Sequence, residues 1–480
     1  MTNDNVLLAT DTYKMGHMIY YPEGTTKIYS YLCARSSRKY NAALFFGLQY
    51  YLREYLAKPI TQADVTEFLM YRKAILGNNP PDVVAKMRAL GDLGYWPISI
   101  KAVPEGTVID NRNVLATITN THPDFAWTVG FLESLLLKVW NTTTVATSSY
   151  EFKQLFGKFA KTTSDIPELV PFQVHDFGYR GCSSEETAAL SGAAHLVSFL
   201  GTDTVPAVKF AKEYYGASEP IGLSVPATEH SVMCAFGREN EIDAFRRMLQ
   251  QNPTGIVSIV SDTYDLWNVL TNIAFQLKDE ILARDGKVVF RPDSGDQKLI
   301  LCGDPMAQKG SPAWKGALRL LDEMFGSTVN SKGYKQLNPK VGLIYGDGMF
   351  FSRTADILET MRQMGFASTN LVIGVGGILL QNHTRDDLGF AVKATFAEVN
   401  GEKRELFKDP ITDPGKRSHK GYMKLVEENG KFVTVDQVSE EEEKTGLLKE
   451  VFRDGKILQY VTFDEVRERA RAFKGELLRV

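Results

Sequence analysis

The chain has 480 residues, 44% of them hydrophobic and 24% charged, which are the proportions of a globular protein long enough for two or three domains. Its net charge of −3 provides no global field for nucleic acid or for an anionic membrane, so neither is an expected partner. The four cysteines lack CxxC spacing and indicate neither a zinc site nor a disulfide framework, which favours a reducing, cytoplasmic location.

The N-terminal part of the chain predicts helices and short strands, without the basic and apolar regions of a signal peptide. Alternation over 27–32 predicts a strand that ends in a basic loop, and 95–120 predicts further short strands. Helices are expected over 44–56 and 63–75. The apolar stretch 125–140 is too short to span a bilayer, so we interpret it as a buried helix.

A different pattern begins near residue 168, where short apolar runs alternate with polar or glycine-rich loops. Helices follow most runs: Ser183 and Glu186 fit a capping box, and Ser311 opens a helix that Gly326 closes. This repetition is typical of a parallel α/β fold. Because many strand ends are polar, a (β/α) barrel is favoured over an open sheet. The predicted strands are 172–174, 196–200, 221–225, 256–260, 288–290, 341–345 and 371–373.

The barrel pattern stops after about residue 385. The remainder predicts short strands, an acidic run at 440–443 interpreted as a solvated face, and a final helix over 464–473. We therefore expect an α/β barrel domain over 151–389 and a sheet-rich α+β domain built from both chain ends, 1–150 and 390–480.

One predicted strand end shows the expected chemistry most clearly. The apolar run 288–290 is followed by Arg291, by Pro292, which cannot donate to a sheet, and by Asp293. Ligands bind at the carboxyl ends of strands in α/β proteins. A structural ion pair between Arg291 and Asp293 explains this stretch alone equally well.

The other strand ends add carboxylates, glycines and a histidine. Clustered carboxylates require a cation or a cationic substrate, and Mg²⁺ bound through water and substrate phosphates suits such a site. The loop 374–377 is able to approach a phosphate closely, although a plain tight turn is an equal interpretation. His230 is a candidate acid, base or phosphate acceptor, or a structural residue. The expected barrel mouth contains Asp176, Arg180, Asp203, His230, Asp262, Arg291, Asp293 and Asp347.

Taken together, these motifs resemble the nicotinamide phosphoribosyltransferase family, in order from about residue 5 to residue 470. The loop after Arg35 is shorter than in vertebrate members. The motifs that carry the resemblance are Leu8–Lys14, His175–Gly181, Gly201–Thr204, Ser224–His230, Ser261–Asp265, Arg291–Gly295, Gly346–Gly348, Leu380-Gln381, Thr384–Asp386, Phe407–Pro410 and Asp413–Ser418.

The resemblance implies a type II phosphoribosyltransferase fold and a homodimer with shared active sites. The implied reaction joins nicotinamide and 5-phosphoribosyl-1-pyrophosphate into nicotinamide mononucleotide, releasing pyrophosphate, in NAD salvage. Mg²⁺ is implied as cofactor through the substrate phosphates, with no direct ligands assigned. ATP is implied as co-substrate, and its hydrolysis phosphorylates an active-site histidine, which His230 matches.

The resemblance also implies the remaining site residues. Phe177 stacks on the pyridine ring, Tyr13 of a second subunit stacks on its other face, and Asp203 accepts a hydrogen bond from the carboxamide. The ribose and phosphate region includes Asp262 and Asp293, which we assign with His230 as catalytic, and Arg180, Ser258, Arg291 and Asp347. The 5′-phosphate site is implied to be Gly346, Gly376, Gly377 and Arg385, and the pyrophosphate or ATP phosphates are assigned to Arg35, Lys393, Lys408 and Lys416.

Elementary chemistry agrees with these roles. A flat neutral ring binds between two aromatic faces, and carboxylates stabilise an oxocarbenium-like ribose. An ionised Asp203 accepts from an amide but repels the carboxylate of nicotinic acid, which predicts a preference for nicotinamide. The alternatives are a nicotinate phosphoribosyltransferase, another barrel enzyme such as an aldolase, and a non-catalytic binding or signalling protein on this fold.

Overall fold

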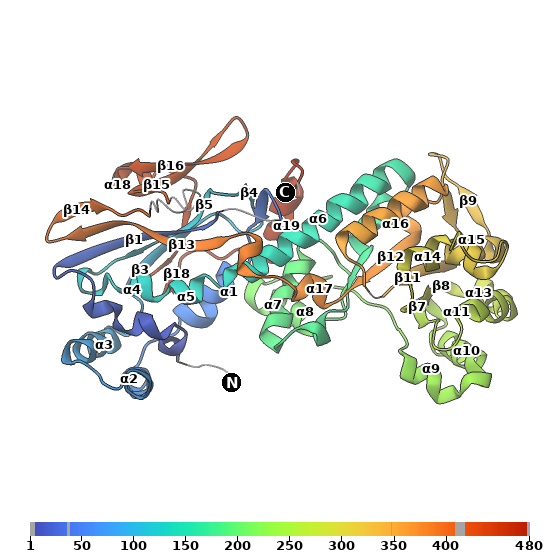
Figure 1. Cartoon of the computed structure of the whole chain (residues 1–480), viewed down its shortest axis with the longest axis horizontal. Coiled ribbons are helices and arrows are strands. Elements are labelled where there is room, and N and C mark those ends of the chain that lie inside the picture. Colours follow the sequence, from blue (N-terminus) through green and yellow to red (C-terminus); the bar gives the residue numbers. More distant parts are fainter. Residues whose placement is uncertain (1–4, 36–38, 347, 409–417, 478–480) are drawn as a thin grey trace. The chain divides into compact units, whose positions relative to one another are not determined.

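The computed structural model describes residues 5–35, 39–346, 348–408 and 418–477. The chain forms two compact units (Figure 1). Unit 1 comprises Met1–Thr147, Ala211–Ser218 and His383–Val480, and unit 2 comprises Ser148–Phe210 and Glu219–Asn382. The chain changes unit four times, and two of these changes lie within helices, α6 (Val139–Thr163) and α8 (Val205–Tyr215).

Unit 1 is built on an antiparallel sheet to which both ends of the chain contribute. Tyr29 on an interior strand pairs with Thr119 on one side and with Phe396 on the other. The sheet order is β14 (Glu402–Glu405), β13 (Phe390–Val399), β1 (Thr25–Ala34), β5 (Val114–Asn120), β3 (Ile98–Ala102), β17 (Lys449–Arg453) and β18 (Lys456–Ile457). Two two-stranded antiparallel pairs accompany it, β2 (Ala42–Leu44) with β4 (Val108–Asp110) and the hairpin of β15 (Tyr422–Glu428) with β16 (Lys431–Val438).

Helices pack against this sheet, and the longest described helices that lie wholly within unit 1 are α2 and α3. A 3-10 helix over Thr12–Ile19 carries the N-terminal motif, and another covers Arg385–Asp387. The α-helices are α1 (Leu48–Tyr51), α2 (Gln62–Leu76), α3 (Pro81–Leu93), α4 (Thr128–Phe131), α5 (Glu133–Leu136), α18 (Glu440–Glu443) and α19 (Phe463–Ala472).

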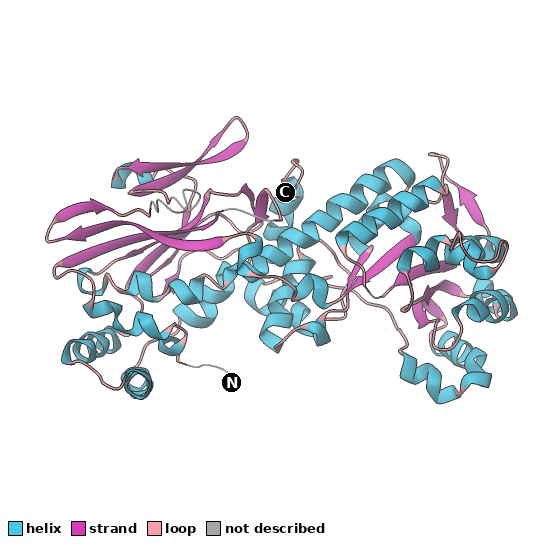
Figure 2. Cartoon of the chain, viewed as in Figure 1, coloured by secondary structure: helices cyan, strands magenta, loops and turns pink. Residues whose placement is uncertain are grey.

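Unit 2 is built on a parallel sheet whose strands lie among helices (Figure 2). Its order is β6 (Val174–Asp176), β12 (Leu371–Val375), β11 (Val341–Tyr345), β8 (Asp285–Arg291) and β7 (Thr254–Val260). Single parallel bridges extend the arrangement beyond both edges: Asp176 with Thr202, Gly201 with Leu223, and Ala227 with Ser258. The result is a curled parallel sheet whose strand ends meet on one side.

The helices of unit 2 follow the strands in alternation, as the sequence predicts. They are α7 (Glu185–Leu196), α9 (His230–Phe236), α10 (Glu241–Gln251), α11 (Leu266–Asn268), α12 (Ala274–Gln276), α13 (Lys278–Ala283), α14 (Gln297–Cys302), α15 (Pro312–Phe325), α16 (Phe351–Gln363) and α17 (Gly377–Leu380). A small antiparallel pair, β9 (Ser327–Val329) with β10 (Lys335–Leu337), completes the unit.

Four of the seven predicted barrel strands, from 256–260 to 371–373, are confirmed as β7, β8, β11 and β12. The strand predicted over 196–200 is wrong, because helix α7 extends to Leu196 and pairing begins only at Gly201. The strand predicted over 221–225 is reduced to a bridge at Leu223. Val174 begins β6, where 172–174 was expected. Buried apolar residues occur at helix ends as well as in strands, so a short apolar run does not by itself distinguish a strand from the end of a helix.

Smaller corrections concern helix ends and burial. The helix cap is Ser184, which accepts from the Thr187 amide, and not Ser183. The stretch 125–140 is buried as expected, but it is divided among α4, α5 and the start of α6. The expected helix over 44–56 begins only at Leu48, and it continues from α1 into a π-helical turn. Predicted helices elsewhere are confirmed as α2, α15 and α19, and the strands over 95–120 as β3, β4 and β5.

The acidic run 440–443 is not simply a solvated face. Ser439 caps it as helix α18, Glu440 pairs with Lys27 at 2.7 Å, and the buried Glu443 pairs with Lys101. Lysines on β1 and β3 therefore fix this short helix to the sheet. None of the helices in the described residues combines the length and apolar character needed to cross a membrane.

Candidate active site

The ends of β7 and β8 are tied together by the residues that follow them. The Ser261 amide donates to the Arg291 carbonyl oxygen at 2.9 Å, and the Arg291 amide donates to the Ser261 hydroxyl at 3.2 Å. Oδ2 of Asp262 accepts from the Asp293 amide at 2.9 Å and from the Ser294 hydroxyl at 2.6 Å. This mutual bonding fixes the carboxylates of Asp262 and Asp293 at neighbouring strand ends.

Asp262 keeps one oxygen without a hydrogen bond. Its side chain is only 5% exposed, and its Oδ1 is buried with no hydrogen-bond partner in the described part of the chain. A buried carboxylate oxygen without a donor is costly, so such atoms mark places where a ligand, ion or water completes the bonding.

His230 faces both carboxylates from the first turn of α9. Its Nδ1 lies 3.0 Å from Oγ1 of Thr263, which orients the ring. Its Nε2 lies 3.8 Å from Oδ1 of Asp262 and 3.9 Å from Oδ2 of Asp293. The imidazole is 46% exposed, so Nε2 is accessible to an incoming group.

Arg291 points toward the aromatic ring of Phe177. Its guanidinium donates to the Thr228 carbonyl oxygen at 2.7 Å and lies 5.9 Å from the Phe177 ring centroid. The Nε of Arg291 is buried without an acceptor among the described residues. Among those residues Arg291 forms no ion pair with Asp293, so the structural pair that the sequence left open is not what holds this side chain.

Phe177 is placed by the backbone of its neighbouring strand. Its amide donates to the Val375 carbonyl oxygen at 2.8 Å. A Cβ atom on Gly374 would lie 2.4 Å from the Phe177 ring, so only glycine allows the ring this close to β12. The half-buried ring therefore offers a fixed aromatic surface.

Asp203 is held by donors from two other strand ends. Its Oδ1 accepts from Nε2 of His175 at 2.9 Å and from the Ser224 hydroxyl. Partial burial favours the neutral carboxyl, but these hydrogen bonds and the charge of Arg291 together hold the pKa of Asp203 below its usual value. The carboxyl is thus ionised at neutral pH and 44% exposed.

Asp176 of the expected mouth and Ser258, which the resemblance assigns to the ribose and phosphate region, are both buried. Asp176 is fully buried, and its oxygens accept from the Gly178 amide at 2.7 Å and from the Thr202 hydroxyl at 3.0 Å. It therefore joins β6 to the neighbouring bridge and is structural. Ser258 is buried on β7, and its hydroxyl lacks a hydrogen-bond partner among the described residues.

The glycines predicted for phosphate binding allow close backbone approach. A Cβ on Gly346 would meet Oδ1 of Asp293 at 2.4 Å, and one on Gly377 would meet the Gly181 carbonyl oxygen at 3.1 Å. Gly376 precedes the first turn of α17 and has open space beside it. Arg180 is exposed on the short helical turn that contains Gly181.

The other predicted residues lie in unit 1. Tyr13 is 61% exposed on the N-terminal 3-10 helix, and Arg385 is exposed beside Asp386. Burial lowers the pKa of the Lys393 ammonium, and the positive charges of Arg35 and Lys408 lower it further, with Glu133 opposing them. Arg35 and Lys408 thus lie close enough to Lys393 to disfavour its positive charge, and we call these three residues the cation group of unit 1. Asp347 and Lys416 lie outside the described residues.

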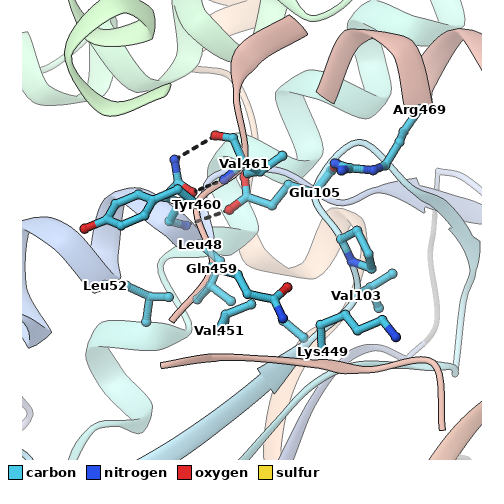
Figure 3. Close-up of a pocket in the computed structure, with 13 residues that line it drawn as sticks. Leu48, Leu52, Val103, Glu105, Lys449, Val451, Gln459, Tyr460, Val461 and Arg469 are labelled. Atoms are coloured by element: carbon cyan, nitrogen blue, oxygen red, sulfur yellow. Dashed lines mark hydrogen bonds between the residues drawn. The ribbon is translucent and has the colours of Figure 1, made fainter. Parts of the chain in front are cut away.

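Unit 1 also contains a cavity of about 430 Å³ between α1, β3 and the C-terminal segment (Figure 3). Glu105 lines it, but its carboxylate accepts from the amides of Gly47 and Gln49, each at 2.6 Å, and from the Tyr215 hydroxyl at 2.8 Å. Burial raises the pKa of Glu105 despite these bonds. The carboxylate fixes the surrounding backbone, and none of the predicted site residues lines the cavity.

Three residues that hold the site had no assigned role at the level of sequence: His175, Ser224 and Thr263. All three lie within the strand-end motifs, adjacent to residues that were assigned. This position next to assigned residues was the one feature of the sequence that could have indicated their role. It was not sufficient, because the partner of each lies on another strand end, between 21 and 33 residues away in sequence.

The fold is a mixed α/β fold shared with solved phosphoribosyl-transfer enzymes. It is similar to nicotinate-nucleotide pyrophosphorylase from Pyrococcus furiosus, with a TM-score of 0.58, 16% identity, and coverage of 98% of this chain and 95% of that one. It is also similar to human nicotinic acid phosphoribosyltransferase, with a TM-score of 0.54, 17% identity, and coverage of 96% and 93%. At these identities the likeness concerns the fold alone.

Sequence comparisons narrow the class. The model of the nicotinate phosphoribosyltransferase (NAPRTase) family matches 172–456, and the model of the nicotinamide phosphoribosyltransferase N-terminal domain matches 5–76. The chain is 44% identical to the nicotinamide phosphoribosyltransferase of Acinetobacter baylyi over 97% of both chains. It is 41% identical to that of Xanthomonas campestris pv. campestris over 98% of both. The chain belongs to the nicotinamide phosphoribosyltransferase family.

Proposed function

We propose that this chain transfers phosphoribosyl from 5-phosphoribosyl-1-pyrophosphate to nicotinamide, giving nicotinamide mononucleotide and pyrophosphate in NAD salvage. The observation that carries the proposal is the group at the strand ends of unit 2. There, His230 faces Asp262 and Asp293, and an ionised Asp203 lies in the same set of loops as Phe177. Identity of 44% over nearly the whole length to a nicotinamide phosphoribosyltransferase supports it.

Nicotinamide would bind on the ring of Phe177, with its carboxamide NH₂ donating to Asp203. Gly374 and His175 both lie close to this ring, so a stacked clamp requires a second aromatic surface from elsewhere. We propose that the exposed Tyr13 of a second copy of the chain supplies it, in a homodimer with shared active sites.

This assignment makes the oligomeric state testable. Light scattering of the whole protein is expected to give the mass of a dimer, and Tyr13→Ala is expected to raise KM for nicotinamide about tenfold, because one stacking face is lost. Tyr20→Ala, which truncates another exposed tyrosine nearby in sequence, is the control. A monomeric mass would remove Tyr13 from the site.

The carboxylates of Asp262 and Asp293 would stabilise positive charge as the bond from the anomeric carbon to pyrophosphate breaks. Ser258 and Arg291 have polar atoms buried without partners in the described residues, which suits hydrogen bonds to the ribose and phosphate region. We assign Arg180 and Asp347 to the same region. No covalent attack by the protein is needed, because nicotinamide nitrogen is itself the nucleophile.

We propose that Gly346, Gly376, Gly377 and Arg385 hold the 5′-phosphate, and that Arg35, Lys393, Lys408 and Lys416 hold pyrophosphate or the ATP phosphates. The repulsion within the cation group of unit 1 is relieved when a polyanion binds there. We place the catalytic barrel over 151–389, with the sheet-rich domain formed by the two flanking parts of the chain.

Mg²⁺ fits the donor set as an ion carried by substrate phosphates. The orphaned Oδ1 of Asp262 and the neighbouring carboxylate of Asp293 are the hard oxygen donors that this ion takes. The described residues contain no group of three His, Cys, Asp or Glu side chains arranged to hold a metal. When bound, Mg²⁺ would neutralise charge on the departing pyrophosphate.

We further propose that His230 accepts a phosphoryl group from ATP at Nε2, since Nδ1 is occupied by Thr263. Phosphorylation would replace an imidazole facing two carboxylates by an anionic group, and so alter the loops that bind phosphate. This couples ATP hydrolysis to product formation in the cytoplasm, where all four free thiols would stay reduced.

The test of the function is formation of nicotinamide mononucleotide from nicotinamide and 5-phosphoribosyl-1-pyrophosphate, with and without ATP. Nicotinate is the competing base, and equal kcat/KM for the two would favour a nicotinate phosphoribosyltransferase instead. Absence of product from either base would leave a binding or signalling role for the fold.

Asp203→Asn sharpens this comparison. The amide of Asn is able to donate to the carboxylate of nicotinate, which ionised Asp203 repels. The ratio of kcat/KM for nicotinamide to that for nicotinate is expected to fall about 10- to 100-fold. Asp279→Asn on the outer helix α13 is the control for a lost surface charge. An unchanged ratio in Asp203→Asn would remove the carboxamide contact.

A further inference from the structure

The carboxylate of Asp203 is held from one side only. Nε2 of His175 and the hydroxyl of Ser224 both donate to the same oxygen, Oδ1. Oδ2 carries no hydrogen bond from the described residues. Two donors on one oxygen fix the rotation of the carboxylate about its Cβ–Cγ bond, because turning it would break both bonds together.

The two donors come from separate strand ends. His175 belongs to β6, and Ser224 follows the bridge at Leu223, whereas Asp203 follows the bridge at Thr202. The position of Oδ2 is therefore set by three neighbouring elements of the parallel sheet and not by the loop of Asp203 alone.

His175 is itself held in place. Its side chain is 12% exposed, and its ring lies 4.8 Å from that of Phe177 at an interplanar angle of 44°. A Cβ atom on Gly201 would lie 2.8 Å from Nδ1 of His175, so the lack of a side chain at Gly201 leaves room for this ring. To donate from Nε2, the neutral ring must carry its proton on that nitrogen.

We infer that His175 and Ser224 are positioning residues that hold Asp203 with Oδ2 available to the substrate carboxamide, and that they thereby determine selectivity for nicotinamide over nicotinate. The inference rests on the proposed function. His175 contacts both the ring-binding Phe177 and the amide-binding Asp203, so it fixes the relation between the stacking surface and the hydrogen-bond acceptor. A carboxylate free to rotate would meet the carboxamide in many orientations, and it would discriminate less between nicotinamide and nicotinate.

The central variant is His175→Phe, which keeps an aromatic ring beside Phe177 but removes the donor. KM for nicotinamide is expected to rise about tenfold with kcat changed less than about threefold, because binding of the base is weakened before the chemical step. The ratio of kcat/KM for nicotinamide to that for nicotinate is expected to fall by a similar factor. His175→Gln, whose amide is able to donate to Asp203, is expected to recover most of both losses.

Ser224→Ala provides an independent measurement, since it removes the second donor with little change in volume. Its effect is expected in the same direction, and the effects of Ser224→Ala and His175→Phe should not add, because the two donors act on one oxygen. Ser331→Ala is the matched control: it removes a serine hydroxyl that donates to Asp165 at 2.6 Å in the same unit.

The outcomes separate the two proposals. If the wild-type protein forms no nicotinamide mononucleotide, the proposed function fails and this inference fails with it. If the wild type is active but Ser224→Ala and folded His175→Phe keep the wild-type KM and base preference, only the inference is overturned. A fall in kcat alone, without a change in KM or without recovery in His175→Gln, also overturns it.

Discussion

Asp262→Ala is expected to lower kcat for nicotinamide mononucleotide formation by about 10²- to 10³-fold, the range typical of losing one preorganised electrostatic group at a reacting centre. The carboxylate serves two purposes. Oδ1 is aimed at the site without a hydrogen-bond partner in the described chain, while Oδ2 holds the Asp293 amide and the Ser294 hydroxyl. Removing it takes away negative charge near the proposed ribose site and also the bonds that hold the loop of Asp293.

These two contributions separate experimentally. Asp165 accepts hydrogen bonds from the same two kinds of donor as Asp262. They are a backbone amide at 2.8 Å and a serine hydroxyl at 2.6 Å, both from Ser331. Asp165→Ala therefore loses equivalent bonds away from the strand ends, and its kcat is expected to stay within about twofold of wild type. Steady-state kinetics of both variants, with circular dichroism melts, test this. Wild-type kcat in folded Asp262→Ala would exclude a catalytic role.

The sequence predicted the parallel unit well where a strand end carried a specific motif. Strands β7, β8, β11 and β12 stand where apolar runs stop at polar loops. The run 196–200 failed because its apolar side chains are buried at the end of helix α7, and burial has no periodicity over five residues. Only pairing partners distant in sequence, such as Gly201 with Leu223, decide which segments join the sheet.

The candidate site shows a similar division. Motifs indicated which residues belong at the strand ends, because carboxylates, arginine and glycine there suggest phosphate and ribose chemistry. They did not indicate which carboxylate is structural. Asp176 is the last residue of β6 and Asp262 follows β7, yet both oxygens of Asp176 are bonded within the fold, whereas Asp262 keeps one oxygen unbonded. That difference depends on donors brought in by other strands.

His230→Ala is expected to abolish the stimulation of product formation by ATP while keeping ATP-independent synthesis within about tenfold of the wild-type rate without ATP. The reason is geometric. Thr263 occupies Nδ1, whereas Nε2 lies nearly 4 Å from each of two carboxylates, too far for a hydrogen bond that would block it. Removing the imidazole removes the proposed phosphoryl acceptor but leaves both carboxylates that we assign to the ribose.

The direct measurement is labelling with ATP carrying a radioactive γ-phosphate, followed by acid treatment, which releases phosphate from histidine. Wild type is expected to carry acid-labile label that His230→Ala lacks. His122→Ala is the matched control, since His122 is exposed to the same extent, 47%, and also lies 3.9 Å from an aspartate. Label that persists in His230→Ala, or none in wild type, would refute the assignment.

Because Asp262 and Asp293 both face the unmodified ring, an anionic phosphohistidine should be repelled by them. This repulsion is a physical means by which ATP could drive loop rearrangement during turnover.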